Sequence, residues 1–183
     1  TNICHVDLEY YSLFSLESLF QRHGLEVFDV LLNDINGGSF RIYIQHKGAR
    51  GIRPSVLKLR KSEEKLSLFD KKAYQDFVSR IMKLKERTKS FIEGEVRKGK
   101  KVYVYGASTK GNTLLQFYNL KYPVIGAAAE RNPIKWGKKT VATLFPIISE
   151  EQARKERPDY FLILTWHFLK EFIKREENYL KSG

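Results

Sequence analysis

The stretch Lys101-Val-Tyr-Val-Tyr-Gly-Ala-Ser-Thr-Lys-Gly-Asn-Thr113 carries the signals from which we predict the fold. Its first five residues are β-branched or aromatic apart from the lysine, which is typical of a buried strand. Gly106 ends this strand, Ser108 and Thr109 are residue types preferred at a helix N-terminus, and residues 113–118 indicate the helix that follows. We therefore predict a strand, a glycine-containing turn and a helix in direct succession.

The predicted turn is a candidate anion site. A helix N-terminus presents backbone N–H groups without intrahelical partners, and its dipole adds partial positive charge. The spacing Gly106-x-x-x-x-Gly111 lacks the G-x-G-x-x-G of dinucleotide folds, and Lys110 precedes the second glycine, which excludes a P-loop. Two interpretations remain: a phosphate or nucleotide contact, or a plain turn whose glycines allow tight packing. The residues of the first interpretation are Gly106, Ser108, Thr109, Lys110, Gly111 and Asn112.

Strands and helices alternate through the remainder of the C-terminal part. A long amphipathic helix is predicted from Asp70 to Arg97, and we expect its apolar stripe to face the core. The later elements are strands at 122–129, 140–144 and 160–165 and helices at 149–156 and 167–180. This alternation predicts an α/β fold, with a Rossmann-like, mostly parallel sheet flanked by helices.

Three further candidates for substrate or nucleotide binding follow predicted strands, because parallel sheets bind ligands beyond their carboxyl ends. Glu130 is placed to hold ribose hydroxyls, or it is a surface carboxylate paired with Arg131. Asn132 begins a turn at Pro133 and is a candidate ligand contact. Trp166 is placed to stack on a base, or it is a partly buried core tryptophan.

Residues 1–46 are predicted to form a separate first unit. Ser15 is the expected N-cap of a helix over 15–24, and the strands 26–32 and 39–44 are expected to form an antiparallel hairpin. A helix followed by such a hairpin is typical of the end of a class I methyltransferase domain, so we interpret this unit as the tail of one. The domains expected after it are a basic linker or flap at 47–69 and the Rossmann-like domain at 70–183.

Composition restricts the partners. The 183 residues carry a net charge of +12, which favours anionic partners such as nucleotides and phosphosugars. Lysines are mixed with glutamates along the chain, as on a solvated surface, so nucleic acid is not an expected partner. The single cysteine, Cys4, fits a reducing compartment, and no apolar run reaches 18 residues; we expect a cytoplasmic protein without a membrane span. The chain begins with Thr1, and we interpret it as part of a longer protein.

The N-terminal residues Cys4-His-Val-Asp7 bring together a thiol, an imidazole and a carboxylate. The other histidines are scattered, so we expect no metal site in this chain. His5 and Asp7 are our candidate catalytic residues, because a carboxylate raises the basicity of a neighbouring imidazole and the pair suits general-base catalysis. The other interpretation is a purely local structural role.

Several stretches resemble one family, the sugar C-methyltransferases that use S-adenosylmethionine and act on nucleotide-linked keto-sugars. The similarity extends from residue 1 to about residue 175, and the Gly-Ala-Ser-Thr-Lys-Gly-Asn-Thr block is its most specific part. The matching stretches are Leu8-Glu-Tyr-Tyr-Ser-Leu13, Arg22-His-Gly-Leu-Glu-Val27, Asn36-Gly-Gly-Ser39, Tyr105-Gly-Ala-Ser-Thr-Lys-Gly-Asn-Thr113, Asn132-Pro-x-Lys-x-Gly137 and Pro158-Asp-Tyr160.

The resemblance implies a zinc-binding N-terminal piece, a methyl-donor domain and a Rossmann-like C-terminal domain, with the substrate between the last two. This chain would then be the C-terminal, substrate-binding half, inactive alone, with S-adenosylmethionine and zinc bound by upstream parts and not by this chain. Its expected partners are a nucleotide-sugar substrate, the upstream methyltransferase domain and a second copy of itself. The alternative is a non-catalytic nucleotide-binding or regulatory module.

At one position the chain departs from the family pattern. The family has Tyr-His-Glu-His before its Leu-x-Tyr-Tyr-Ser, and this chain has Cys4-His5-Val6-Asp7. His5 alone is retained. Asp7 stands where the resemblance implies a proton-abstracting histidine, and a carboxylate is also able to accept a proton.

Overall fold

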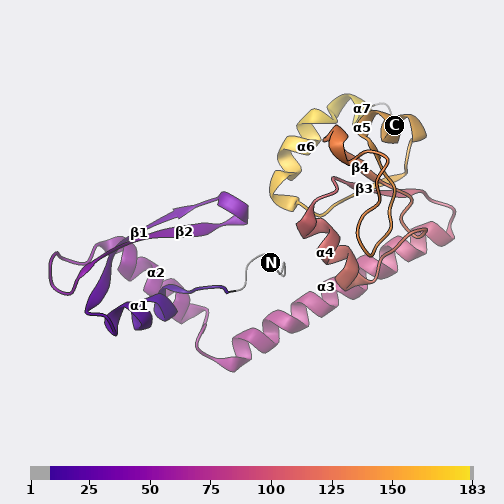
Figure 1. Cartoon of the computed structure of the whole chain (residues 1–183). Helices are drawn as coiled ribbons and strands as arrows, with labels where there is room; N and C mark the ends of the chain where they lie inside the picture. Colours follow the sequence, from indigo (N-terminus) through magenta and orange to yellow (C-terminus); the bar gives the residue numbers. More distant parts are fainter. Residues whose placement is uncertain (1–8, 182–183) are drawn as a thin grey trace. The chain divides into compact units, whose positions relative to one another are not determined.

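The computed structural model describes residues 9–181 of the chain. It has the predicted mixed α/β fold. Contacts divide the described residues into two compact units, 9–80 and 81–181, which we call the N-terminal and C-terminal units and describe separately (Figure 1). Helix α3 (Lys71–Arg97) begins in the first unit and continues into the second. Of the described helices, none is long and apolar enough to cross a membrane.

The C-terminal unit is built on four parallel strands, which confirms the predicted parallel sheet. The strands are β3 (Val102–Tyr105), β4 (Ala128–Glu130), β5 (Ile147–Ser149) and β6 (Tyr160–Ile163). Their spatial order is β5-β4-β3-β6. All four residues of β3 are buried, as expected for a central strand of a parallel sheet covered on both faces.

Alternation along β3 sends its side chains into two different clusters. Val102 and Val104 pack with Leu115 of helix α4 (Thr109–Tyr118) and with Ile92 of α3. Tyr103 belongs to the second cluster, on the opposite face, together with Ala153 of helix α5 (Glu150–Glu156), and the ring of Tyr105 contacts Phe161 on the same face. Helices therefore cover both faces of the sheet.

The turn after β3 forms as predicted, but helix α4 begins earlier than expected. Ser108 is the N-cap, and its Oγ accepts a hydrogen bond from the Gly111 N–H at 3.0 Å. The helix therefore starts at Thr109 rather than at Thr113, because the cap fixes the first turn regardless of the polarity of the residues in it.

The connection from β4 to β5 differs from the prediction. Residues 122–127 precede β4 without being strand, residues 133–135 form a 3₁₀ turn, and 140–144 form a turn in place of the expected strand. Ala142 and Leu144 have φ values of +63° and +62°, which a strand excludes.

The expected C-terminal helix is divided into three pieces. These are a 3₁₀ turn (Trp166–Phe168), helix α6 (Leu169–Arg175) and helix α7 (Glu177–Lys181). The break falls at Glu176, whose buried carboxylate is hydrogen-bonded to Tyr105 of β3 and to Arg154 of α5. A tertiary contact that no local pattern encodes thus accounts for the break.

The N-terminal unit contains helix α1 (Leu13–Gln21), strands β1 (Leu25–Asn33) and β2 (Ser39–His46), and helix α2 (Pro54–Lys65). The predicted antiparallel hairpin is confirmed, with a bulge between Val27 and Asp29. A small core of Leu13, Val27, Val30 and Val56 joins the hairpin to both helices.

Two local expectations in this unit are corrected. The N-cap of α1 is Ser12 rather than Ser15, and the two serines exchange hydrogen bonds in a capping box. The segment 47–69 contains helix α2, with Pro54 in its first turn and Val56 fully buried. Its polar, basic composition concealed a helix that buries only a narrow stripe.

The apolar stripe of α3 was expected to be core, and most of it is not. Ile92 is buried, whereas Tyr74, Val78, Leu84 and Phe91 are each about half exposed. Helical spacing predicted the stripe correctly, but spacing alone does not determine what covers it.

Candidate functional site

Three strands of the C-terminal unit end at the same edge of the sheet. β3 is followed by Gly106, β4 ends at Glu130, and Trp166 lies three residues beyond β6. Parallel pairing of β4 and β6 with β3 brings these ends together, as predicted. After β3 the chain forms β4 and β5 on one side of it, and then returns to form β6 on the other side, in the order β5-β4-β3-β6. Open α/β sheets bind ligands outside the carboxyl ends of the strands at such a switch point.

The loop after β3 leaves three backbone donors available. The Gly106 N–H bonds to the carbonyl of Ala129 (2.7 Å), and Ser108 accepts from the amides of Gly111 and Asn112. Within residues 9–181, no hydrogen-bond partner is found for the amides of Ser108, Thr109 and Lys110. In the same part of the chain Lys110 has no ion pair. These groups open helix α4 and suit an anion.

Glu130 connects two loops of this edge rather than projecting freely. Its Oε2 accepts hydrogen bonds from the amide of Ala107 (2.9 Å) and from Lys135 Nζ (3.2 Å), and its Oε1 accepts from the amide of Asn132 (2.9 Å). Partial burial opposes ionisation, but the two amides and Lys135 outweigh it and lower the pKa of Glu130 below its ordinary value. The ionised carboxylate therefore connects the β3–α4 loop to the β4–β5 connection by hydrogen bonds; we call this contact the Glu130 bridge.

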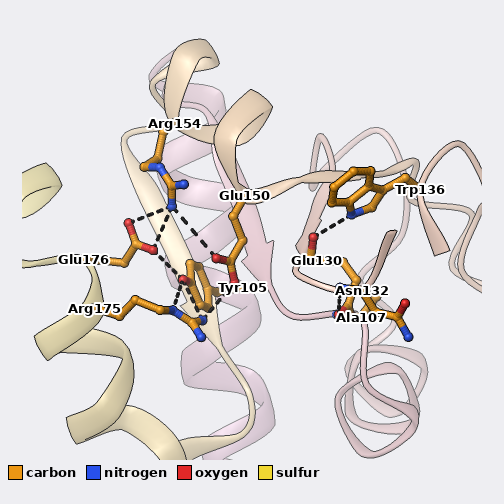
Figure 2. Close-up of polar contacts among 9 residues, drawn as sticks. All are labelled: Tyr105, Ala107, Glu130, Asn132, Trp136, Glu150, Arg154, Arg175 and Glu176. Carbon is orange, nitrogen blue, oxygen red and sulfur yellow. Dashed lines mark hydrogen bonds and ion pairs between the residues drawn. The ribbon is translucent and has the colours of Figure 1, made fainter. Parts of the chain in front are cut away.

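The segment after β4 contributes two residues that sequence reasoning did not single out. Lys135 bonds to the carbonyl of Ala107 (3.0 Å) as well as to Glu130. The indole N–H of Trp136 donates a hydrogen bond to the backbone carbonyl of Glu130 (Figure 2), and the distance is 2.7 Å. Both lie within Asn132-Pro-x-Lys-x-Gly137, one of the stretches that carry the family resemblance.

Other predicted site residues hold the edge together. Asn132 accepts from the amide of Ile134 and so caps the short turn. Asn112 accepts from the hydroxyl of Thr143 (2.6 Å) and donates to the carbonyl of Val141 (3.0 Å), which fixes the turn at 140–144.

Gly111 has a packing role. A Cβ at this position would lie 3.0 Å from the Oγ of Ser108 and 3.4 Å from two side-chain carbons of Leu164. The glycine thus allows α4 to approach the end of β6 closely.

Trp166 lies on the β6 side of the edge and is 57 % exposed. Its ring meets that of His167 edge-on, with centroids 5.9 Å apart. It is not the partly buried core tryptophan that we weighed as the other interpretation.

A partly buried cluster of polar side chains involves Tyr105, the last residue of β3 before the site loop (Figure 2). The hydroxyl of Tyr105 donates to Glu176 (2.6 Å) and accepts from Arg175 (2.9 Å). Arg154 binds Glu176, and Arg175 binds Glu150, at 2.9 and 2.8 Å. Burial, and then the hydrogen bond to Glu176, raise the pKa of Tyr105 above its ordinary value, so the hydroxyl stays protonated. The cluster fixes the C-terminal helices on the sheet.

His5 and Asp7 lie outside the described residues. Within the described part of the chain, no group of three or more histidine, cysteine, aspartate or glutamate side chains has the arrangement of a metal site.

Comparison with known proteins gives the family. The family described as "C-methyltransferase C-terminal domain" matches residues 34–183. The C-methyltransferase NovU of Streptomyces niveus is 34 % identical over 182 residues, which cover 99 % of this chain and 43 % of NovU. The chain therefore spans less than half the length of this relative, and it belongs to the C-methyltransferase C-terminal domain family.

Proposed function

We propose that this chain is the substrate-binding C-terminal domain of an S-adenosylmethionine-dependent C-methyltransferase that acts on a nucleotide-linked keto-sugar in the cytoplasm. The observation that carries the proposal is that, within residues 9–181, the three backbone N–H groups of Ser108, Thr109 and Lys110 have no hydrogen-bond partner. They lie at the switch point of the parallel sheet. Family membership supports the methyltransferase class.

The diphosphate of the substrate would lie on these amides, with the cation of Lys110 beside them. Glu130 keeps the loop in place through Ala107, and its partner Lys135 adds a second cation near the same edge. Trp166 borders the site on the β6 side. Gly106, Gly111, Asn112 and Asn132 serve by shaping the loops rather than by direct contact.

The reaction that the resemblance implies needs a base. Asp7 would accept the proton from the carbon beside the keto group, and His5 would orient it. The electron pair left on that carbon would then form a bond to the donor's methyl carbon while the methyl–sulfur bond breaks, and the electron pair of the broken bond would stay on the sulfur of the departing thioether. S-adenosylmethionine, which we propose binds to upstream sequence, supplies an electrophilic methyl group when bound; zinc would belong to an N-terminal piece further upstream.

The phosphate site is tested by calorimetry on this chain with a nucleoside diphosphate. We expect binding that weakens with added salt, because the main contacts are charged. Lys110→Gln should lower the affinity several-fold. Lys121→Gln removes an equal charge just after the C-terminal end of α4 and should not.

The competing phosphate surface is the basic segment 47–69. Several of its cations are already engaged: Arg53 with Asp29 (3.2 Å) and Arg60 with Glu17 (2.5 Å). Arg50 lies over the ring of Phe28. If the triple neutralisation of Arg50, Arg53 and Lys58 abolished nucleotide binding while Lys110→Gln left it intact, the site would belong to this segment.

The base is tested in a protein that also carries the upstream region. Asp7→Asn keeps the size and removes the proton-accepting oxygen, so turnover should fall about 100-fold or more with substrate binding little changed. Unchanged turnover would remove Asp7 from the mechanism. This chain alone should show no stoichiometric micromolar site for S-adenosylmethionine in calorimetry.

A further inference from the structure

The chain has two tryptophans, and they lie on opposite sides of the proposed phosphate site. Trp136 follows β4 and lies next to β5, where Gly137 and Lys138 are hydrogen-bonded to Ile147 at 2.9 Å. Trp166 follows β6 at the other side of β3. A ligand whose phosphates occupy the loop after β3 therefore has an aromatic ring available toward each end.

The two rings differ in what they still offer. The indole N–H of Trp136 is already used by the carbonyl of Glu130, so only the face of the ring is available, and the side chain is 44 % exposed. Within residues 9–181 the indole N–H of Trp166 has no hydrogen-bond partner, and the side chain is 57 % exposed. A flat base needs a ring face, whereas the hydroxyl and carbonyl oxygens of a sugar can accept a hydrogen bond from an N–H.

Trp136 is also held in one orientation. Its backbone N–H bonds to Pro133, and the turn that carries it is capped by Asn132 and connected to the β3–α4 loop through Lys135 and Glu130. A ring fixed before binding loses little conformational entropy when a base stacks on it.

We propose that the nucleobase of the substrate stacks on Trp136 and that the sugar lies toward Trp166. This orientation rests on the proposed function. It gives the direction in which the ligand lies along the sheet edge, with the base near β4, the diphosphate at Ser108–Lys110 and the sugar near β6. It reverses our sequence-based expectation that Trp166 receives the base.

Two tryptophans allow a direct optical test. In Trp166→Phe the single remaining tryptophan is Trp136, and in Trp136→Phe it is Trp166, so excitation selective for tryptophan reports on one ring at a time. UDP, TDP, GDP, ADP and inorganic pyrophosphate are titrated into each variant. A nucleoside diphosphate should quench the emission of Trp136 by stacking, pyrophosphate should not, and neither should quench Trp166 strongly.

Calorimetry with the same probes adds a second readout. Trp136→Ala should weaken the best-binding nucleoside diphosphate about tenfold or more and leave pyrophosphate within about twofold, because stacking on an aromatic ring favours the base only. Trp136→Phe should restore most of the affinity. Trp166→Ala is the matched control and should leave nucleoside diphosphates without a sugar within about twofold.

The outcomes separate the two proposals. Nucleotide binding with quenching confined to Trp166, or with the affinity loss confined to Trp166→Ala, would overturn the orientation and leave the phosphate site standing. Binding of neither pyrophosphate nor any nucleoside diphosphate to the unmodified chain would overturn the proposed function, and the orientation with it.

Discussion

The two sheets of this chain differ in how completely they are covered. The four parallel strands of the C-terminal unit have helices on both faces, and β3 is buried throughout. The hairpin of the N-terminal unit is covered on one face, and Leu31 and Tyr43 of its other face are 50 % and 37 % exposed. Parallel sheets require cover on both sides, whereas an antiparallel pair tolerates one open face.

The difference shows which unit is self-contained. A two-stranded hairpin is marginal without further strands or packing, and in the described part of the chain neither β1 nor β2 pairs with a third strand. We expect the open face and edges to meet another surface, either the upstream region or a second copy of the chain. The candidate site, by contrast, lies wholly on the completed sheet.

The largest effect is expected at the centre of the C-terminal unit. Phe145 is fully buried in its main cluster, so Phe145→Ala should lower the free energy of unfolding by about 3–5 kcal/mol. Leu144→Ala, at the exposed neighbouring residue, should change it by about 0.5 kcal/mol or less. Chemical denaturation gives both values. Hydrogen exchange should localise the loss to residues 81–183; equal loss of protection in both units would contradict their independence.

In the N-terminal unit the corresponding weak point is polar. Glu63 of α2 is buried and accepts hydrogen bonds from the amides of Leu13 (2.6 Å) and Phe14 (2.9 Å) at the start of α1. Glu63→Ala leaves two donors unpaired and should cost about 2 kcal/mol. Glu64→Ala removes an exposed neighbour and serves as the control. Faster exchange at the amides of Leu13 and Phe14 checks the assignment, and unaltered exchange there would refute it.

A smaller effect is expected where the C-terminal helices meet the sheet. Tyr105→Phe removes the hydroxyl between Glu176 and Arg175 and should cost about 1–2 kcal/mol, since a buried carboxylate loses a donor. Tyr122→Phe, at an exposed tyrosine, should be neutral. Thermal unfolding of both variants measures the effect. If Tyr105→Phe is as stable as the unmodified chain, Arg154 alone is enough to pair the Glu176 carboxylate.

Acid should weaken the Glu130 bridge between the two loops of the site. The pKa of Glu130 is lowered in the fold, so its stabilising contribution is fully present above the unfolded glutamate's pKa of about 4.3 and is lost as the pH falls through the lower folded value. In Glu130→Gln the free energy of unfolding of the C-terminal unit, measured by chemical denaturation at a series of pH values, should therefore fall less steeply as the pH is lowered. Glu86→Gln, at an exposed carboxylate of α3, should leave that dependence on pH unchanged. If the free energy of unfolding falls equally steeply with acid in Glu130→Gln and in the unmodified chain, the Glu130 bridge does not contribute as proposed.

The smallest effect on stability is expected on the open hairpin face. Leu31→Ser exchanges an exposed side chain of this face and should alter the free energy of unfolding by about 0.5 kcal/mol or less. If this face binds a second copy, the substitution should reduce self-association in sedimentation at high concentration. Association that is unaffected by it would assign the contact to another surface.

The sequence was most informative where signals are local. The strand, glycine turn and helix at 101–118 follow from adjacent residues, and alternation predicted the parallel sheet that brings Glu130 and Trp166 to one edge. Helix α2 was missed because one buried stripe in a basic segment gives a weak periodic signal.

The side-chain network of the site could not be predicted in the same way. Tyr105 and Glu176 are 71 residues apart, and their meeting depends on which face of the sheet the last helices cover. Trp136 and Lys135 looked like turn residues, and their roles come from contacts with Glu130 and Ala107 across loops. The position of Lys110 in the first turn of α4 could be predicted from local sequence, and its role in binding stays a prediction.

The contact between Glu63 and the start of α1 also bears on the order of folding. The two elements are separated by 50 residues, so α1 cannot have its first amides satisfied until the chain between them has closed. The β1–β2 hairpin and α2 involve nearer neighbours and are expected to form sooner. Substitutions at Glu63 should thus accelerate unfolding more than they slow refolding, the kinetic signature of a contact made after the rate-limiting step.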